Sequence, residues 1–298
     1  MERIQTAIDK ARKAREGHSD PAAARAPAQM GKPKSAPPVA EEREAKKPLV
    51  LSSDMSFKER DEAWAALKRV DPKQTHLERK RIVAYQTGPE AVPYDVLRTR
   101  LLHQMRANNW RRVAITSPNA GAGKTMTCVN LAFSLARAPD QRTMLIELDL
   151  RRPSMAALLG IEGNQQFSKA LSGQDAPEDH ILRYGRNLAF AVNQTTARNP
   201  SELLQGVTAG KVIDELEERY LPEIMMFDTP PLFASDDTMA FLDQVDCALL
   251  IGEAEKTTIE EIDKCEQELA ARTNVLGVML NKCRYLVSHE GYGEQYGY

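Results

Sequence analysis

The stretch "TSPNAGAGKTMTCVNLAFSLA", residues 116–136, determines the fold that this sequence predicts. An apolar run, "RVAIT" at 112–116, leads into it, and Cys128, Ala132 and Leu135 then follow at the spacing of one helix face. The order is therefore strand, glycine-rich loop, helix. In that order the N–H groups of the loop and the positive end of the helix can surround a phosphate group. The stretch predicts a nucleotide-binding loop in an α/β domain.

The loop supplies the groups that phosphate binding requires. Gly121 and Gly123 let the backbone approach the phosphates closely, and Lys124 can reach the β- and γ-phosphates of ATP. The hydroxyl of Thr125 can bind Mg²⁺. The strict pattern G-x-x-x-x-G-K-[ST] also asks for an early glycine, where this chain has Pro118. The predicted nucleotide-binding residues here are Asn119, Ala120, Gly121, Ala122, Gly123, Lys124, Thr125 and Met126.

Two further apolar runs end in acidic residues. "IMMFDTPP" ends its strand at Asp228, as a Walker B carboxylate does, which holds Mg²⁺ directly or through water. "MLIELDLRRP" ends its strand at Glu147, with Asp149 two residues on, so both acids leave the strand on one side if the chain stays extended. One acid of this pair is expected beside the metal ion and the other at the substrate proton. The residues alone leave that order open.

Apolar runs alternate with helical stretches from about residue 84 onward. Several runs are apolar almost throughout, as expected for strands that are covered on both faces. The alternation predicts a doubly wound α/β domain of the P-loop NTPase type, with a mostly parallel sheet and its site at the carboxyl ends of the strands. The candidate strands are residues 112–116, 143–147, 188–192, 224–228, 247–251 and 275–280.

Composition divides the chain into segments. The first residues place Ile4 and Ile8 at helical spacing among Arg and Lys, and an Ala-, Pro- and Lys-rich stretch follows that cannot bury enough apolar surface to order itself. The predicted segments are a short basic helix (1–16), a disordered linker (17–54), a small helical element (55–83), the P-loop domain (84–284) and a flexible tyrosine-rich tail (285–298).

Composition also narrows the function classes. The chain of 298 residues is 42% hydrophobic and 28% charged, as in ordinary soluble proteins. Its formal net charge of −2 argues against nucleic acid as the main partner. No apolar run approaches the length of a membrane-spanning helix, and the N-terminus lacks the apolar core of a secretory signal. The cysteines form no C-x-x-C pair, which favours reduced thiols in a cytoplasmic protein.

With these motifs the sequence resembles the bacterial tyrosine kinases of exopolysaccharide and capsule synthesis, of the CpsD/CapB type. These kinases share the P-loop class of the MinD and ParA ATPases. The resemblance covers roughly residues 84–298 and rests on "TSPNAGAGKT", "LIELDLRRP" as a variant Walker A′, "FDTPP" as Walker B, "VLGVMLNK", and the tyrosine-bearing tail. The loop of these kinases lacks the early glycine, so Pro118 is no objection to a working loop.

The resemblance implies an ATP-dependent protein-tyrosine kinase that uses Mg²⁺ and phosphorylates its own tail. It makes Glu147 the base that accepts the tyrosine proton, and it places Asp149 nearer the metal ion, which Thr125 and Asp228 also hold. The catalytic residues implied in this way are Lys124, Glu147, Asp149 and Asp228.

The tail supplies candidate acceptors, because most of its tyrosines lie among glycines, where they cannot form a packed core. The resemblance implies that this tail is the autophosphorylation substrate and that Asn281 lines the adenine pocket. It also implies self-association, activation by a membrane polysaccharide co-polymerase (a chain-length regulator), and a cytoplasmic location at the inner face of the membrane through that partner. The candidate acceptors are Tyr285, Tyr292, Tyr296 and Tyr298.

Several residues depart from the pattern of these kinases. Glu147 replaces the usual aspartate, and in the E-x-x-R-x-x-R assembly helix Val92 and Asp95 replace the glutamate and the first arginine, so only Arg98 remains. These changes motivate a second hypothesis, a non-catalytic nucleotide-binding scaffold of the polysaccharide export complex. A third is an ATPase of the MinD/ParA kind, although Asn119 stands where that branch has its signature lysine.

Overall fold

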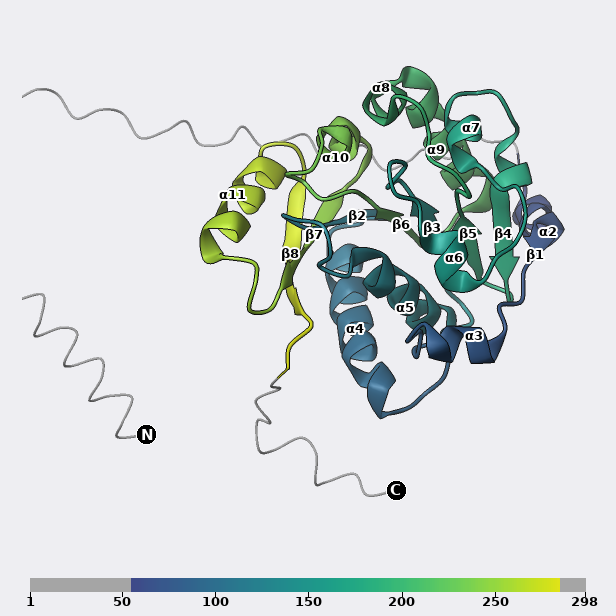
Figure 1. Ribbon diagram of the computed structural model, residues 1–298. Coiled ribbons are helices and arrows are strands. Elements are labelled where there is room, and N and C mark those ends of the chain that lie inside the picture. Colours follow the sequence, from purple (N-terminus) through teal and green to yellow (C-terminus); the bar gives the residue numbers. More distant parts are fainter. Residues whose placement is uncertain (1–54, 285–298) are drawn as a thin grey trace, which may run out of the picture. The chain divides into compact units, whose positions relative to one another are not determined.

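The computed structural model describes residues 55–284 (Figure 1). The predicted basic helix, linker and tyrosine tail lie outside these residues. In chain order the elements are α2 (Phe57–Ala66), β1 (Lys68–Arg69), α3 (Gln74–Arg79), η1 (Pro89–Ala91), α4 (Val92–Ala107), β2 (Arg112–Thr116), α5 (Lys124–Ala136), β3 (Thr143–Glu147), α6 (Met155–Leu159), α7 (Phe167–Leu171), η2 (Pro177–His180), β4 (Ile181–Tyr184), β5 (Leu188–Ala191), α8 (Pro200–Gln205), α9 (Val207–Tyr220), β6 (Ile224–Asp228), α10 (Asp237–Phe241), η3 (Leu242–Gln244), β7 (Cys247–Glu253), α11 (Ile259–Ala270) and β8 (Asn274–Asn281).

The strands form one sheet in the order β1-β4-β5-β3-β6-β2-β7-β8. Every neighbouring pair is parallel except β4 with β5. The predicted doubly wound, mostly parallel α/β fold is therefore confirmed. Strands β2, β3 and β6 have the bounds that the sequence predicts, whereas the short strands β1 and β4 at one side of the sheet were not predicted.

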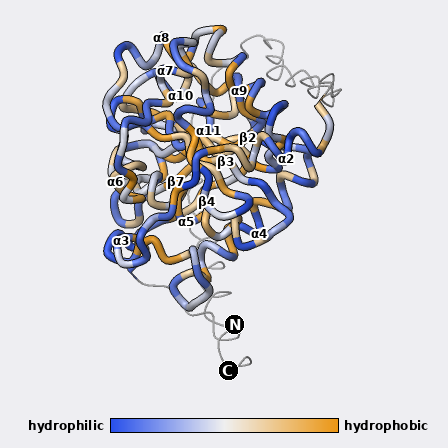
Figure 2. The backbone as a smooth tube through the Cα atoms, turned by 90° about the vertical axis from the view of Figure 1, so that its right-hand side faces the viewer, coloured by the Kyte–Doolittle hydropathy of each residue, from blue (hydrophilic) through white to orange (hydrophobic). Residues whose placement is uncertain are grey.

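Helices cover both faces of the sheet (Figure 1). Helices α3, α4, α5 and α6 pack on one face, and α2 and α7 through α11 pack on the other. Every residue of β2, β3 and β6 is buried, which explains why these strands are apolar throughout instead of alternating. Figure 2 shows the same arrangement, with hydrophobic positions gathered along the central strands.

The strand order brings three functional strand ends together. Strand β6 lies between β3 and β2, and Asp228 is in register with Glu147 on one side and Ile115 on the other. Because these strands are parallel, their carboxyl ends meet at one edge of the sheet, where ligands of such folds bind. The glycine-rich loop and the two acidic strand ends are therefore neighbours.

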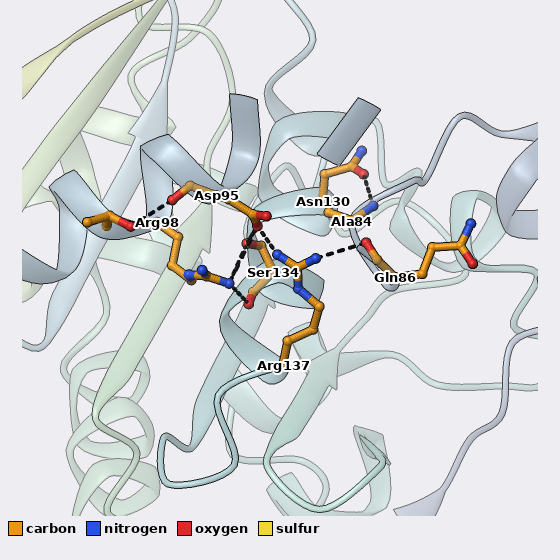
Figure 3. Close-up of polar contacts among 8 residues, drawn as sticks. Ala84, Gln86, Asp95, Arg98, Asn130, Ser134 and Arg137 are labelled. Atoms are coloured by element: carbon orange, nitrogen blue, oxygen red, sulfur yellow. Dashed lines mark hydrogen bonds and ion pairs between the residues drawn. The ribbon is translucent and has the colours of Figure 1, made fainter. Parts of the chain in front are cut away.

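A polar cluster joins α4 to α5 (Figure 3). Asp95 accepts a hydrogen bond from Ser134 Oγ at 2.6 Å and pairs with both Arg137 and Arg98. Arg98 also donates to the Ser134 carbonyl at 2.8 Å, and Arg137 donates to the Gln86 carbonyl at 2.9 Å. Arg98, which remains from the assembly pattern, therefore bonds to its own domain.

Removal of the Asp95 carboxylate should lower stability, because it leaves Ser134, Arg98 and Arg137 without their shared acceptor. Partial burial alone would raise the pKa of Asp95, but hydrogen bonds from Arg137 and Ser134 and the charges of Arg137 and Arg98 lower it overall. Its contribution is therefore complete above about pH 4 and is lost as the pH falls through the lowered pKa. We expect Asp95→Ala to lower the free energy of unfolding by about 1–3 kcal/mol at pH 7.

Urea denaturation at pH 7 and at pH 3 would measure this difference. Asp71→Ala is the matched control, because Asp71 forms an exposed ion pair with Arg69 at 3.8 Å. Equal losses in the two variants, or a loss for Asp95→Ala that is unchanged at pH 3, would contradict the interpretation.

Candidate active site

The loop between β2 and α5 has the backbone that phosphate binding needs. Gly121 and Gly123 both have φ of 89°, in the left-handed region where other residues are strained. A Cβ atom at position 123 would also lie 2.4 Å from Asn281 Nδ2, so any other residue there would displace the Asn281 side chain. Helix α5 begins at Lys124 without a side-chain cap, which leaves its first N–H groups available to an anion.

Residues at the end of β8 support this loop. Asn281 Nδ2 donates to the Ala122 carbonyl at 2.8 Å, and Lys282 Nζ donates to the Gly121 carbonyl at 2.6 Å. Lys282 also pairs with Glu253 at 3.1 Å. A hollow of about 230 Å³ lies here, lined by residues 119–122 of the loop and by Glu253, Lys256, Thr257 and Lys282. The structure thus places Asn281 beside the loop, while its predicted role at the adenine remains a prediction.

Other predicted loop residues have distinct surroundings. Asn119 and Ala120 are exposed, and Asn119 Nδ2 donates to Glu261 Oε1 at 2.6 Å. Lys124 is 7% exposed at the start of α5, and its charge opposes the rise that burial causes in the pKa of Asp149 and Asp228. Met126 is half-buried and packs against the core between α5 and the sheet.

Asp228 is fully buried and only partly bonded. Its Oδ1 lies 3.7 Å from Cys128 Sγ, while Oδ2 has no hydrogen-bond partner within residues 55–284. Burial raises the pKa of Asp228 to about 7, although the Thr125 hydroxyl and the Lys124 charge oppose the shift. A buried carboxylate oxygen without a partner, beside a hydroxyl, is a donor set that suits Mg²⁺, which uses one or two carboxylates together with substrate phosphates. The residues present therefore fit the predicted metal ion.

The carboxylate of Glu147 is held by backbone N–H groups of the protein interior. Its carboxylate is fully buried: Oε1 accepts hydrogen bonds from the N–H groups of Ser154 at 2.6 Å and Met155 at 2.7 Å. Oε2 accepts from the N–H of Asn193 at 2.9 Å. The extra methylene of glutamate carries the carboxylate to these amides. A base needs an oxygen that a substrate hydroxyl can reach, and the predicted role of base for Glu147 stays a prediction.

Backbone hydrogen bonds connect Asp149 to Asp228. The N–H groups of Leu148 and Asp149 both donate to the Asp228 carbonyl, at 2.8 and 3.1 Å. Asp149 Oδ1 accepts from the Arg152 N–H at 3.1 Å. Burial raises the pKa of Asp149, and the Arg152 hydrogen bond and the Lys124 charge oppose the rise. Asp149 is therefore a half-buried acid at this sheet edge, and the charge of Lys124 stabilises its ionised form.

Comparison with known proteins identifies the domain. Residues 113–291 match the CobQ/CobB/MinD/ParA nucleotide binding domain. The chain belongs to this family. The match begins in β2 and includes the glycine-rich loop and both acidic strand ends.

Similar proteins within this class include tyrosine kinases. The chain is 29% identical over 205 residues to tyrosine-protein kinase CpsD of Streptococcus pneumoniae. This alignment covers 66% of this chain and 86% of CpsD. It is also 29% identical to EpsB of Ralstonia solanacearum over 203 residues, but spans only 27% of that relative's length. Among solved structures, the kinase domain of Escherichia coli tyrosine kinase ETK is similar with a TM-score of 0.60 and 25% identity, over 70% of this chain and 80% of that one.

The two arginines after Asp149 in this nucleotide-binding domain differ in their surroundings. Arg151 forms a two-pronged pair with Asp237, at 2.7 and 2.9 Å, and also contacts Ser201. Arg152 is exposed. Asp237 and Ser201 lie 86 and 50 residues from Arg151 in the sequence, so no local pattern predicts these contacts.

Two further predictions concern membrane-spanning helices and the tyrosine acceptors of the tail. Within the described residues, no helix is both long enough and apolar enough to cross a membrane. The predicted acceptors Tyr285, Tyr292, Tyr296 and Tyr298 all lie outside the described residues.

The raised pKa of Asp228 makes the stability of this nucleotide-binding domain depend on pH. The folded protein holds the proton up to about pH 7, whereas the unfolded chain loses it near 3.8. Without Mg²⁺, the folded protein is therefore destabilised progressively between these values and stays so above pH 7. We expect Asp228→Asn to raise the free energy of unfolding at pH 8 by on the order of a few kcal/mol, and to change it little at pH 4.

Urea denaturation in the presence of a chelator tests this expectation. Asp243→Asn, at an exposed position, is the control and should shift neither curve by more than a few tenths of a kcal/mol. An Asp228→Asn variant that is less stable than the parent at pH 8 would show that burial of the ionised carboxylate does not destabilise the folded protein.

Proposed function

We propose that this chain is an ATP-dependent protein-tyrosine autokinase that phosphorylates its own C-terminal tyrosine tail and regulates exopolysaccharide or capsule synthesis and export. The observation that supports it most is the set formed at one sheet edge by Lys124, Thr125 and Asp228, whose buried Oδ2 has no hydrogen-bond partner within residues 55–284. The similarity to CpsD and to the ETK kinase domain favours phosphoryl transfer to tyrosine over the other activities of the family.

The nucleotide is bound by the loop and the start of α5. The N–H groups that follow Gly121 and Gly123 surround the β- and γ-phosphates, and Lys124 neutralises the charge that develops on them. Thr125 and Asp228 would hold Mg²⁺, which would supply further positive charge to stabilise the phosphates.

In the proposed reaction, a tyrosine oxygen forms a bond to the γ-phosphorus of ATP while the bond from that phosphorus to the bridging oxygen breaks. ADP leaves from the opposite side, and the tyrosine proton passes to an acid at the end of β3. Transfer of this kind depends mainly on positioning and charge stabilisation, so the accepting acid need not be a strong base.

Partners and location complete the proposal. A membrane polysaccharide co-polymerase activates the kinase and holds it at the inner face of the membrane, and the tail of one subunit reaches the site of another. This assembly needs a contact other than the Arg98 contact typical of these kinases, because Arg98 bonds to Ser134 and Asp95 of its own domain.

Intact-mass measurement after incubation with ATP and Mg²⁺ tests the proposal. The parent protein should gain the mass of one or more phosphates, and the chain truncated after Val287 should lose most of that gain. Lys124→Met should lower the rate by about 10²-fold or more, because it removes charge stabilisation in the transition state. Lys211→Met, at an exposed position on α9, is the matched control and should behave as the parent.

Each outcome discriminates between hypotheses. ATP binding without any mass gain, also in the presence of the cytoplasmic segment of the membrane partner, would favour the non-catalytic scaffold and contradict the kinase. Release of inorganic phosphate from ATP without phosphotyrosine would instead favour an ATPase of the MinD/ParA kind.

A further inference from the structure

Glu147, which stands where the similar kinases have aspartate, forms hydrogen bonds that hold the backbone after β3. Both carboxylate oxygens are occupied by three backbone N–H groups, from Ser154, Met155 and Asn193. Asn193 returns the contact, since its Nδ2 donates to the Glu147 carbonyl at 3.2 Å. The Oδ1 of Asn193 accepts from the Ser168 N–H at 2.9 Å, so the asparagine side chain is itself held in place.

These bonds close the chain segment between Glu147 and Ser154 into a loop. The segment starts at the last residue of β3 and returns to the carboxylate of that same residue, just before α6 begins. Within it, the N–H groups of Leu148 and Asp149 are tied to the Asp228 carbonyl. Hydrogen bonds therefore fix this loop at both of its ends and at Leu148 and Asp149. Asp149 is the acidic residue inside the loop.

The two acids at the end of β3 thus have opposite surroundings. Glu147 is fully buried and its oxygens are saturated with amide donors. Asp149 is half-buried, and only its Oδ1 accepts a hydrogen bond, from Arg152, among the described residues. Asp149 Oδ2 is the oxygen of this pair that a tyrosine hydroxyl can approach.

We propose that Glu147 and Asn193 form a positioning pair that holds the 147–154 loop, and that Asp149 Oδ2, not Glu147, accepts the tyrosine proton. This inference rests on the proposed kinase reaction. In it the tyrosine O–H bond breaks as the oxygen–phosphorus bond forms, and the proton stays on Asp149 until ADP and the phosphotyrosine leave. Thr125 and Asp228 remain for the metal ion.

Side-chain length separates a positioning role from a base. Glu147→Gln keeps the length and one acceptor oxygen, so it can retain the Ser154 and Met155 bonds and lose only the Asn193 bond. Glu147→Asp keeps the charge, but it is one methylene too short to reach these amides. A positioning role predicts that Gln retains more activity than Asp, with Gln within about tenfold of the parent kcat. A base predicts the reverse order, with Gln lowered by about 10²-fold or more.

Two further variants complete the kinetic test. Asp149→Asn should lower kcat by about 10²-fold or more, with the KM for ATP little changed, because it removes the proton acceptor. Asn193→Ala combined with Glu147→Gln should be no worse than the more severe single variant, since both disrupt one structure. Glu217→Gln is the matched control: Glu217 is a buried glutamate paired with Arg112 at 2.6 Å, and its loss should lower stability but not kcat.

Amide hydrogen exchange gives a result that is independent of kinase activity. The N–H groups of Ser154 and Met155 should be protected in the parent and in Glu147→Gln, and should exchange at least tenfold faster in Glu147→Asp. That of Asn193 should be protected only in the parent. Protection in β3 itself should not change. Fast exchange of these amides in the parent would overturn the positioning pair even if the protein is a kinase. Normal protection with no phosphorylation would leave the pair intact and overturn the proposed reaction.

Discussion

The burial of the Asp228 carboxyl is the constraint on which this site depends. Asp228 lies at the end of a strand that is buried on both faces, and its Oδ2 has no hydrogen-bond partner among the described residues. Burial of such a group costs several kcal/mol unless it is neutralised, bonded or bound to a metal ion. Burial, together with the charges of Glu147 and Asp149, raises the pKa of Asp228 to about 7, although the Thr125 hydroxyl and the Lys124 charge oppose the rise. The surrounding sheet holds the carboxylate in a position where a bound cation can neutralise its charge.

The strand order makes that arrangement possible. Because β6 lies between β2 and β3, the glycine-rich loop, Asp228 and the acids of the 147–154 loop share one sheet edge, although they are far apart in the sequence. Bonds from Asn281 and Lys282 support the loop from the side of β8. The nucleotide site is thus built from the ends of four strands and not from one contiguous motif.

Much of this was predictable from the sequence. Strands β2, β3 and β6 are apolar at nearly every position and follow each other at α/β spacing, so their bounds and the parallel sheet could be predicted. Strands β1 and β4 are short and lie towards one side of the sheet, where no such signal exists. The positions of the acids were also predictable, but not their hydrogen bonds. One additional methylene takes the Glu147 carboxylate to Asn193, 46 residues away, and periodicity carries no information about such a contact.

Calorimetric titration with Mg-ADP tests the central claim most directly, because it measures whether occupation of the site displaces a proton from Asp228. At pH 6 the carboxyl, with a pKa of about 7, is mostly protonated in the free protein. Binding should then release close to one proton, which two buffers of different ionisation enthalpy reveal. The release should fall towards zero above pH 8, and it should vanish in Asp228→Asn. Tight binding at pH 6 without proton release in the parent protein would contradict the account.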